Sequence, residues 1–115
     1  MITDAAQATL VGRLRKALAD EPTLREVAMF GGRAFMVRGA MVVSSRRGGA
    51  LLVRVADARG PQLLDRAGAS AATMGVGRPM GPGWIEVEAA AVDADGLAAW
   101  LDEALAHNRS TTGTA

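Results

Sequence analysis

The chain has 115 residues, of which half are hydrophobic, and its formal net charge is +1. This length is typical of one domain with a single hydrophobic core. The absence of cysteine excludes disulfides, and one histidine supplies too few ligands for the usual zinc sites. That histidine, His107, is predicted in the last turn of the last helix, where an interaction with the helix dipole is a simpler interpretation than a general base of a Ser-His-Asp constellation. No apolar run approaches the ~20 residues that a bilayer span needs, so we expect a cytoplasmic protein with no membrane contact.

Charge is unevenly distributed along the chain. The segment from Val27 to Gly83 carries a formal charge of +6, whereas the two flanks together sum to −5. Such a basic middle predicts a positively charged surface, provided that the side chains stay exposed. The eight arginines of this segment are Arg33, Arg38, Arg46, Arg47, Arg54, Arg59, Arg66 and Arg78.

Two amphipathic helices are predicted, one near each end of the chain. Asp4 followed three residues later by Gln7 is typical of a capping box, and the first helix is expected from about Ala5 to Ala19. In the last helix, Asp93 and Asp95 favour the N-terminal end, and the residues from Ser110 to Ala115 are expected to fray. The apolar stripes are Leu10, Leu14 and Leu18 in the first helix, and Leu97, Trp100, Leu101 and Leu105 in the last.

Between these helices, short apolar segments predict strands. They are Val27 to Phe30, Ala34 to Val37, Ala40 to Ser44, Ala50 to Val55 and Trp84 to Ala89. The connections are too short for parallel crossovers, so the sheet should be antiparallel. The predicted fold class is therefore α+β, with an antiparallel sheet of about five strands and helices packed on it.

A short middle helix is predicted after the fourth strand. Asp57 is suited to cap it, Pro61 lies in its first turn, and Gly68 is expected at its end. Leu63 and Leu64 are predicted to face inward.

The candidate binding residues are arginines, because no catalytic centre is recognisable. Arg33, Arg46 and Arg47, together with Arg38, fall at predicted turns, where they would be exposed, and Arg78 lies in a loop made rigid by Pro79. A patch of these arginines could contact phosphates or an acidic protein surface. The four aromatic residues all lie in apolar contexts, which disfavours a base-stacking platform. No cofactor or metal is expected.

One enzymatic alternative stays open at this point. Glu86 and Glu88 lie two apart on a predicted strand, about 7 Å apart by strand rise, and with Arg78 could act on a bound metal. The simpler interpretation is a solvated sheet face on which Arg54 is the cross-strand partner.

Several short motifs occur in an order that resembles the N-terminal domain of the TfoX/Sxy family, from about Leu24 to Asn108. They include Met29-Phe30-Gly31-Gly32, Gly77-Arg78-Pro79-Met80 and Trp84-Ile85-Glu86-Val87. An aromatic residue often precedes the second motif in that family, whereas Met74, Gly75 and Val76 stand there in this chain. The remaining strings are Phe35-Met36-Val37, Gly39-Ala40-Met41, Leu51-Leu52-Val53-Arg54 and the helix beginning Leu97-Ala98-Ala99-Trp100-Leu101.

The resemblance implies a fold of the secretion-chaperone-like kind. It also implies that most of the motif residues have a structural role. Gly31 and Gly32 would allow a sharp turn or a close backbone approach. Phe30, Phe35 and Trp84 would fill the layer between sheet and helices. The residues assigned a structural role are Met29, Phe30, Gly31, Gly32, Gly77, Pro79 and Trp84.

The resemblance also implies a role. The longer family members are bacterial regulators of natural competence, thought to act with the cyclic-AMP receptor protein on promoters. They carry a second domain, so promoter activation is not carried over to this chain. We expect one domain over residues 1–109 and a flexible tail over 110–115. We also expect a non-enzymatic, homodimeric regulatory module that binds a protein partner. The alternative is nucleic-acid binding through the central arginines.

Overall fold

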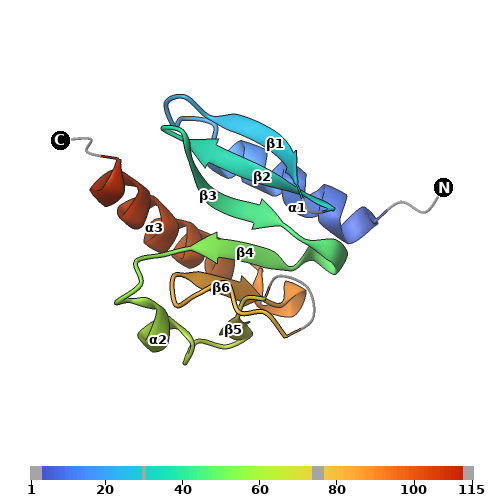
Figure 1. Cartoon of the computed structure of the whole chain (residues 1–115). Helices are drawn as coiled ribbons and strands as arrows, with labels where there is room; N and C mark the ends of the chain where they lie inside the picture. Colours follow the sequence, from blue (N-terminus) through green and yellow to red (C-terminus); the bar gives the residue numbers. More distant parts are fainter. Residues whose placement is uncertain (1–3, 30, 74–76, 113–115) are drawn as a thin grey trace.

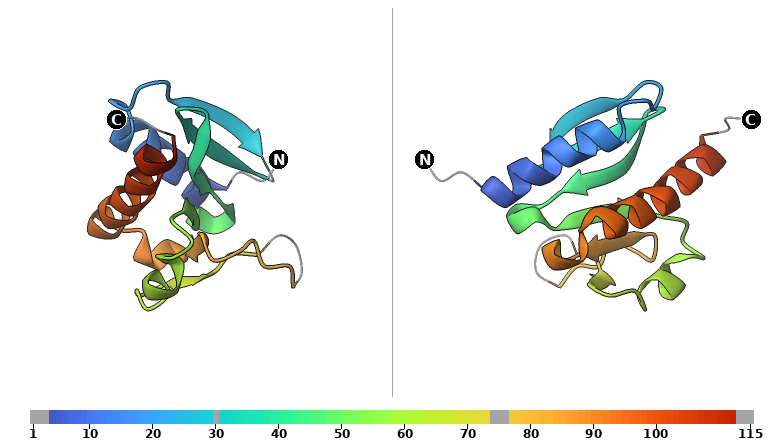
Figure 2. Two further views of the ribbon diagram at one scale, coloured as in Figure 1. Left: turned by 60° about the vertical axis from the view of Figure 1, so that its left-hand side comes forward. Right: turned by 180° about the vertical axis from the view of Figure 1, so that it is seen from behind.

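The computed structural model describes residues 4–29, 31–73 and 77–112. Within them, six strands form one antiparallel sheet in the order β1-β2-β3-β4-β6-β5, and two long helices lie side by side on one face of it (Figures 1 and 2). The α+β class and the antiparallel sheet are confirmed, with one strand more than the five expected. The elements are α1 (Ala5–Ala17), β1 (Arg25–Met29), β2 (Gly32–Val37), β3 (Ala40–Ser45), η1 (Arg47–Gly49), β4 (Leu51–Arg54), α2 (Gly60–Leu63), β5 (Ala69–Ala71), β6 (Trp84–Val87), η2 (Ala89–Ala91) and α3 (Ala94–Thr111).

Helix α1 begins at the predicted cap. The backbone N–H of Gln7 donates to Asp4 Oδ1 at 2.9 Å. The second half of the capping box does not form, because the Gln7 side chain donates to the Gly31 carbonyl at 3.1 Å instead of turning back to Asp4. The start of the helix is thereby tied to the β1–β2 turn. The buried stripe is the predicted one: Leu10, Leu14 and Leu18 are at most 2% exposed.

Helix α3 is capped by Asp93, whose Oδ1 accepts the N–H of Gly96 at 2.7 Å. All four residues of its predicted apolar stripe are buried. The helix continues to Thr111, so Ser110, which was expected to fray, is helical. Near its C-terminal end, Asn108 is only 2% exposed, and its Nδ2 donates to the Val37 carbonyl at 2.9 Å.

The core lies between the sheet and the two long helices. The strand register aligns one apolar side chain from each of four strands in a row, and alternate residues of each strand point to opposite faces. Each side chain of this row lies on the helix side of the sheet and is at most 1% exposed. The row consists of Phe35, Val43, Val53 and Ile85. Period-2 alternation therefore separates a helix-covered face from an open face.

The middle helix departs from the prediction. Helix α2 spans only Gly60–Leu63, and the residue before it is Arg59, which provides no side-chain cap. Asp57 pairs with Arg54 at 3.1 Å instead of capping the helix. Leu63 is buried, but Leu64 is 39% exposed, because a helix of one turn buries only one of two consecutive side chains.

Trp84 also departs from the prediction that it fills the layer between sheet and helices. It is half-buried and lies outside the core cluster, and the Arg54 guanidinium sits 5.1 Å from the centroid of its ring. Its neighbour Ile85 takes the core position, since the two alternate on β6. Phe35 is fully buried as expected, whereas Phe30 lies outside the described residues.

Candidate functional site

The arginines of the basic middle segment are largely paired with glutamates of the acidic flanks. Five of the eight form such ion pairs, and Arg54 pairs within the segment with Asp57. The uneven charge seen in the sequence is thus largely an internal complementarity between segments that fold together. The flank pairs are Arg33 with Glu26 (3.7 Å), Arg38 with Glu21 (3.8 Å), Arg46 with Glu86 (3.2 Å), and Arg59 and Arg66 with Glu103 (3.0 and 3.1 Å).

Two arginines of the segment form no ion pair with a described residue. These are Arg47, in η1, and Arg78, in the loop before β6, and both are exposed. Two others differ from the prediction. Arg33 lies on strand β2 and not at a turn. Arg38 lies at the predicted turn, but its side chain points inward and is only 18% exposed. The predicted positive patch is therefore smaller than the formal charge suggests.

Arg46 connects the end of β3 to the loop between β5 and β6. Besides its ion pair with Glu86, its guanidinium lies 3.5 Å from the Thr73 carbonyl and 3.6 Å from Met80 Sδ. This position corrects the expected pairing of Glu86 with Arg54. It also places Thr73 and Met80 next to Arg46, near the face of β6 that carries Glu86 and lies opposite the core residue Ile85.

The predicted pair of carboxylates on one strand does not form. Glu86 lies on β6, but Glu88 lies beyond the end of the strand and precedes η2. Among the described residues, no group of three or more histidine, aspartate or glutamate side chains could hold a metal ion. The structure therefore gives no support to the metal-dependent alternative.

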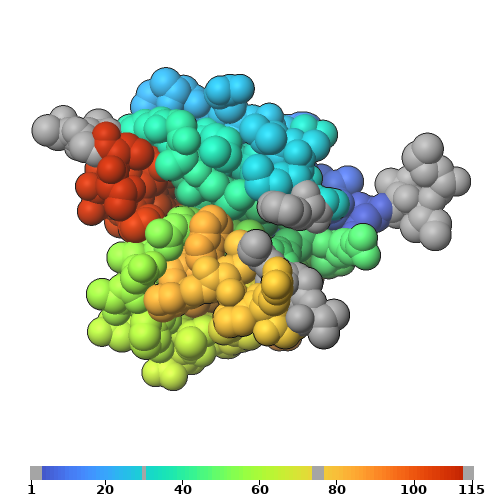
Figure 3. All heavy atoms as spheres, viewed as in Figure 1, coloured from blue at the N-terminus to red at the C-terminus, as the bar shows by residue number. Residues whose placement is uncertain are grey.

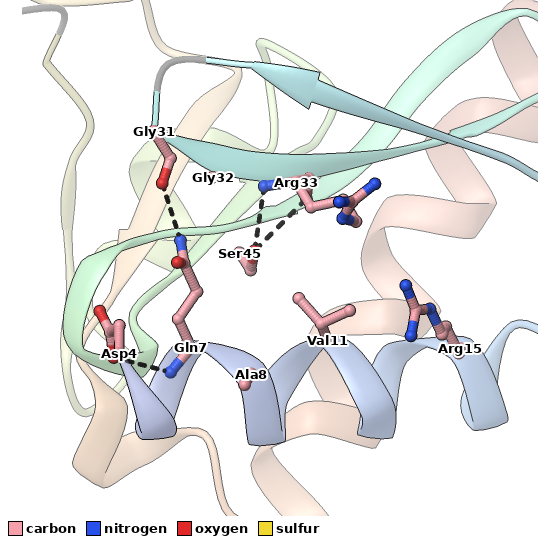
Figure 4. A pocket seen from close by; sticks show the side chains of 9 residues that line it. All are labelled: Asp4, Gln7, Ala8, Val11, Arg15, Gly31, Gly32, Arg33 and Ser45. Atoms are coloured by element: carbon pink, nitrogen blue, oxygen red, sulfur yellow. Dashed lines mark hydrogen bonds between the residues drawn. The ribbon is translucent and has the colours of Figure 1, made fainter. Parts of the chain in front are cut away.

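A cleft of about 400 Å³ lies between helix α1 and the start of strand β2 (Figure 4). Arg15 and Arg33 stand at one end of it and Asp4 at the other, with Ala8 and Val11 along α1 between them. The remaining lining residues are Gln7, Gly31, Gly32 and Ser45. The cleft brings the Gly31-Gly32 motif and one candidate arginine together with residues from the first helix.

The two glycines shape the wall of this cleft. Gly31 has a φ of +76°, in the left-handed region that favours glycine. At Gly32, a Cβ atom would lie 1.9 Å from the Ser45 carbonyl oxygen, so any side chain would push β2 away from β3. Behind this wall, Ser45 is fully buried, and its Oγ accepts the N–H of Arg33 at 3.1 Å.

Both acidic groups near the cleft accept hydrogen bonds from other groups of the protein. Glu26 accepts hydrogen bonds from Arg15 at 2.7 and 2.9 Å, which lowers the pKa of Glu26 and raises that of Arg15. Asp4 accepts the backbone N–H groups of Gly48 and Gln7, and these bonds lower its pKa. Arg33 is different, because its Nε is 3.7 Å from Glu26 Oε1 and its guanidinium makes no hydrogen bond to a described residue.

The structure does not gather the four candidate arginines around this cleft. Arg33 lines it, and the Arg47 guanidinium lies beside Gly31, whereas Arg46 and Arg78 belong to the open face and its loop. Sequence reasoning missed Arg15, because an arginine on a helix is usually solvated. It identified Gln7 only as a capping residue.

Comparison with protein families identifies the family of the chain. The family model of the TfoX N-terminal domain matches residues 16–108. This chain belongs to the TfoX N-terminal domain family. The match begins in the second half of α1, further towards the N-terminus than the motifs themselves, and ends at Asn108. No curated protein and no solved structure matches the chain significantly.

The family match covers β1, β2 and the Gly31-Gly32 wall of the cleft, as well as Arg33 and Ser45. The residues of the α1 wall, Asp4, Gln7, Ala8, Val11 and Arg15, all lie before the matched residues. One wall of the cleft is therefore built from the family region and the other from residues outside it. No helix among the described residues is long and apolar enough to cross a membrane.

Proposed function

We propose that this TfoX N-terminal domain is a cytoplasmic, non-enzymatic interaction module with a regulatory role, and that it binds a protein partner. The family is not known for catalysis, which favours a binding role over an enzymatic one. The observation that carries the proposal is the open face of the sheet over β1, β2 and β3, which no helix covers (Figures 1 and 3).

This open face is largely apolar, with the exposed Arg25, the cross-strand partner of Met36, at its edge. Glu26 pairs across the strands with Phe35, which faces the helices, so Val27 and Met29 point to the opposite side. Met36 follows Phe35 on that opposite side, and Met41 is its neighbour on β3. These four side chains, Val27, Met29, Met36 and Met41, are all half-buried. Methionines adapt to irregular partner surfaces, which suits a protein-binding face.

An exposed arginine in the loop before β6 supplies specificity. Arg78 has no ion-pair partner among the described residues, so it is available to acidic groups of a partner. Arg47 also has no ion-pair partner there, but it lies beside Gly31 and close to Asp4. A nucleic-acid role would need more free arginines than these, because most of the basic segment is already paired with flank glutamates. We therefore place nucleic acid as an alternative outcome of the test.

The homodimer is part of the same proposal. Strand β1 is at the edge of the sheet, and β2 is its only neighbour in the strand order of the described residues. An edge strand presents unpaired N–H and C=O groups that can pair with another chain. Antiparallel pairing of β1 with its copy around Val27 would extend the sheet across a two-fold axis and join the two open faces.

An affinity pull-down from the native cell, with and without nuclease, tests the binding role. The chain is compared with a Met36→Lys variant, which places a charge on the open face, and with Ala99→Lys, which adds the same charge at an exposed position of α3. We expect a protein that survives nuclease, is lost with Met36→Lys and is kept with Ala99→Lys. Retention that disappears with nuclease would favour nucleic acid and overturn the proposal.

Light scattering tests the dimer. We expect a mass of twice 11.8 kDa at micromolar concentration and a monomer for Val27→Lys, because two lysines would meet at the two-fold axis. A monomer for the unmodified chain would remove the dimer from the proposal and leave the heterologous partner to the pull-down.

A further inference from the structure

We propose that the cleft between α1 and β2 binds a small aliphatic monocarboxylate, with the carboxylate on Arg33. This site lies on the helix side of the sheet, and it was assigned neither by the sequence nor by the family. It goes beyond the protein-binding role and does not depend on it, since the proposed partner face is on the opposite side of the sheet.

Arg33 is the group that points to an anion. Its side chain lines the cleft and is 42% exposed, and its guanidinium makes no hydrogen bond to a described residue. Its neighbour Arg15 is already engaged, because two of its nitrogens donate to the two oxygens of Glu26. A planar guanidinium with unused donors matches the geometry of a carboxylate, which it binds through two parallel hydrogen bonds.

The charges around Arg33 determine how many negative charges the ligand carries. Arg15 and Arg33 share the single carboxylate of Glu26, which leaves one positive charge at this end of the cleft. Asp4, at the far end, is held by the backbone N–H groups of Gln7 and Gly48, and the nearby Arg47 guanidinium also lowers its pKa, so its charge is already compensated. A monoanion on Arg33 completes the balance, whereas a dianion would bring excess negative charge near Glu26.

The wall of α1 determines the rest of the ligand. Ala8 and Val11 are three residues apart, so their side chains lie on the same face of the helix and form an apolar strip beside the arginines. A volume of about 400 Å³ falls in the lower part of the range for small-ligand pockets. A carboxylate on Arg33 with a short alkyl chain along Ala8 and Val11 uses both features.

The test is an NMR titration of the full chain with butanoate and with butanamide, which has the same shape but no charge. A ligand with so few atoms is expected to bind with a dissociation constant of about 1 mM. We expect saturable shifts of the backbone amides of Ala8, Val11 and Arg33 with butanoate and no saturation with butanamide. Succinate and inorganic phosphate should bind at least about threefold more weakly than butanoate because of their second charge.

Two variants make the assignment specific. Arg33→Gln should weaken butanoate binding about tenfold or more, because the bidentate ion pair is lost. Arg109→Gln is the matched control, since Arg109 also pairs with a glutamate, Glu21, and is 52% exposed at another place. It should leave the dissociation constant unchanged. Circular dichroism of both variants checks that they are folded.

Several results would overturn the assignment. Equal binding of butanoate and butanamide, or equal affinity of the unmodified chain and Arg33→Gln, would remove Arg33 as the carboxylate site. No saturable shift at about 20 mM butanoate would exclude a ligand of this size. Tighter binding of an N-acetylated tripeptide with a free carboxyl end than of butanoate would reassign the cleft to a peptide. None of these results bears on the pull-down, which tests the opposite face.

Discussion

The two ends of strand β2 use the same pair of residue types and reach different results. At one end Arg38 lies 3.8 Å from Glu21, and at the other Arg33 lies 3.7 Å from Glu26. Arg38 is 18% exposed and also donates to Asn108 Oδ1 at 3.2 Å, whereas Arg33 is 42% exposed and its side chain makes no hydrogen bond to a described residue. The end of α3 closes the first site, and α1 leaves the second open as a cleft.

The distance between two charges therefore does not distinguish a structural ion pair from one whose arginine is still available to a ligand. What separates them is whether a third group satisfies the remaining donors. Asn108 does so at the Arg38 end, which makes that arginine part of the packing between α3 and the sheet. Nothing equivalent among the described residues does so for Arg33, which therefore remains free to bind.

The largest effect is expected from adding a methyl group at Gly32, beside Arg33. Gly32→Ala places a Cβ atom 1.9 Å from the Ser45 carbonyl oxygen, a backbone atom that can move only with strand β3. We expect a loss of about 3 kcal/mol in the free energy of unfolding, measured by urea denaturation. Gly12→Ala is the control, because a Cβ atom there meets nothing within 4 Å, and it should stabilise α1 by up to about 1 kcal/mol. Equal stabilities of the two variants would contradict the close approach of β2 and β3.

The next effect comes from opening the Arg38 end. Asn108→Ala removes the hydrogen bond to the buried Val37 carbonyl and the acceptor for Arg38. The free energy of unfolding should fall by about 2 kcal/mol, because the carbonyl is left buried without this partner. In the same denaturation assay, Ser110→Ala, at an exposed position two residues later, should change it by less than about 0.5 kcal/mol. A loss below that limit for Asn108→Ala would mean that water reaches the carbonyl.

Replacing the two arginines tests the comparison directly. Arg38→Gln should cost about 1.5 kcal/mol, since it breaks a charged hydrogen bond to Asn108 and leaves the largely buried Glu21 with Arg109 as its remaining ion-pair partner. Arg33→Gln should cost less than about 0.5 kcal/mol, as expected for an exposed ion pair. Glutamine is chosen at position 38 because Arg38 has a φ of +54°, in the left-handed region. Glutamine keeps the backbone strain of that conformation, whereas glycine would relieve it. Equal losses would show that the two ends are energetically alike.

The smallest effect is a dependence of stability on pH at the cleft end. The hydrogen bonds from Arg15 hold the pKa of Glu26 below its usual value of 4.5 in the folded chain, against a smaller opposite effect of burial. The contribution of its charge is therefore fully present above pH 4.5 and is lost as the pH falls through the lower, folded pKa. Glu26→Gln should be less stable than the unmodified chain by under about 1 kcal/mol at pH 7. Melting curves from pH 7 to pH 3 should show that difference shrinking, and a constant difference would rule out ionisation of Glu26 as its cause.

Of the candidate site, the sequence indicated two components and missed the others. Gly31 and Gly32 belong to a recognisable motif, and Arg33 was among the arginines singled out. Arg15 and Val11 could not be assigned to the same place, because they come from α1 and meet Arg33 only through tertiary packing. Their spacing carries no signal beyond that of an ordinary helix.

What the sequence determined by itself was the local structure and the family. The stripes of α1 and α3, the Asp4 and Asp93 caps and five of the six strands follow from periodicity and capping, which depend on residues a few positions apart. The exposure of Leu64 was missed because helix α2 is a single turn whose orientation is set by its neighbours.

Only the tertiary structure decided the partners of the charges. The +6 of the middle segment suggested a free basic surface, but Glu21, Glu26, Glu86 and Glu103 from the flanks neutralise most of it. An ion pair forms between groups that the fold brings within a few ångströms, whatever their separation along the chain. The same packing left Arg47 and Arg78 without an ion pair among the described residues, and Arg33 without a hydrogen bond at the mouth of a cleft.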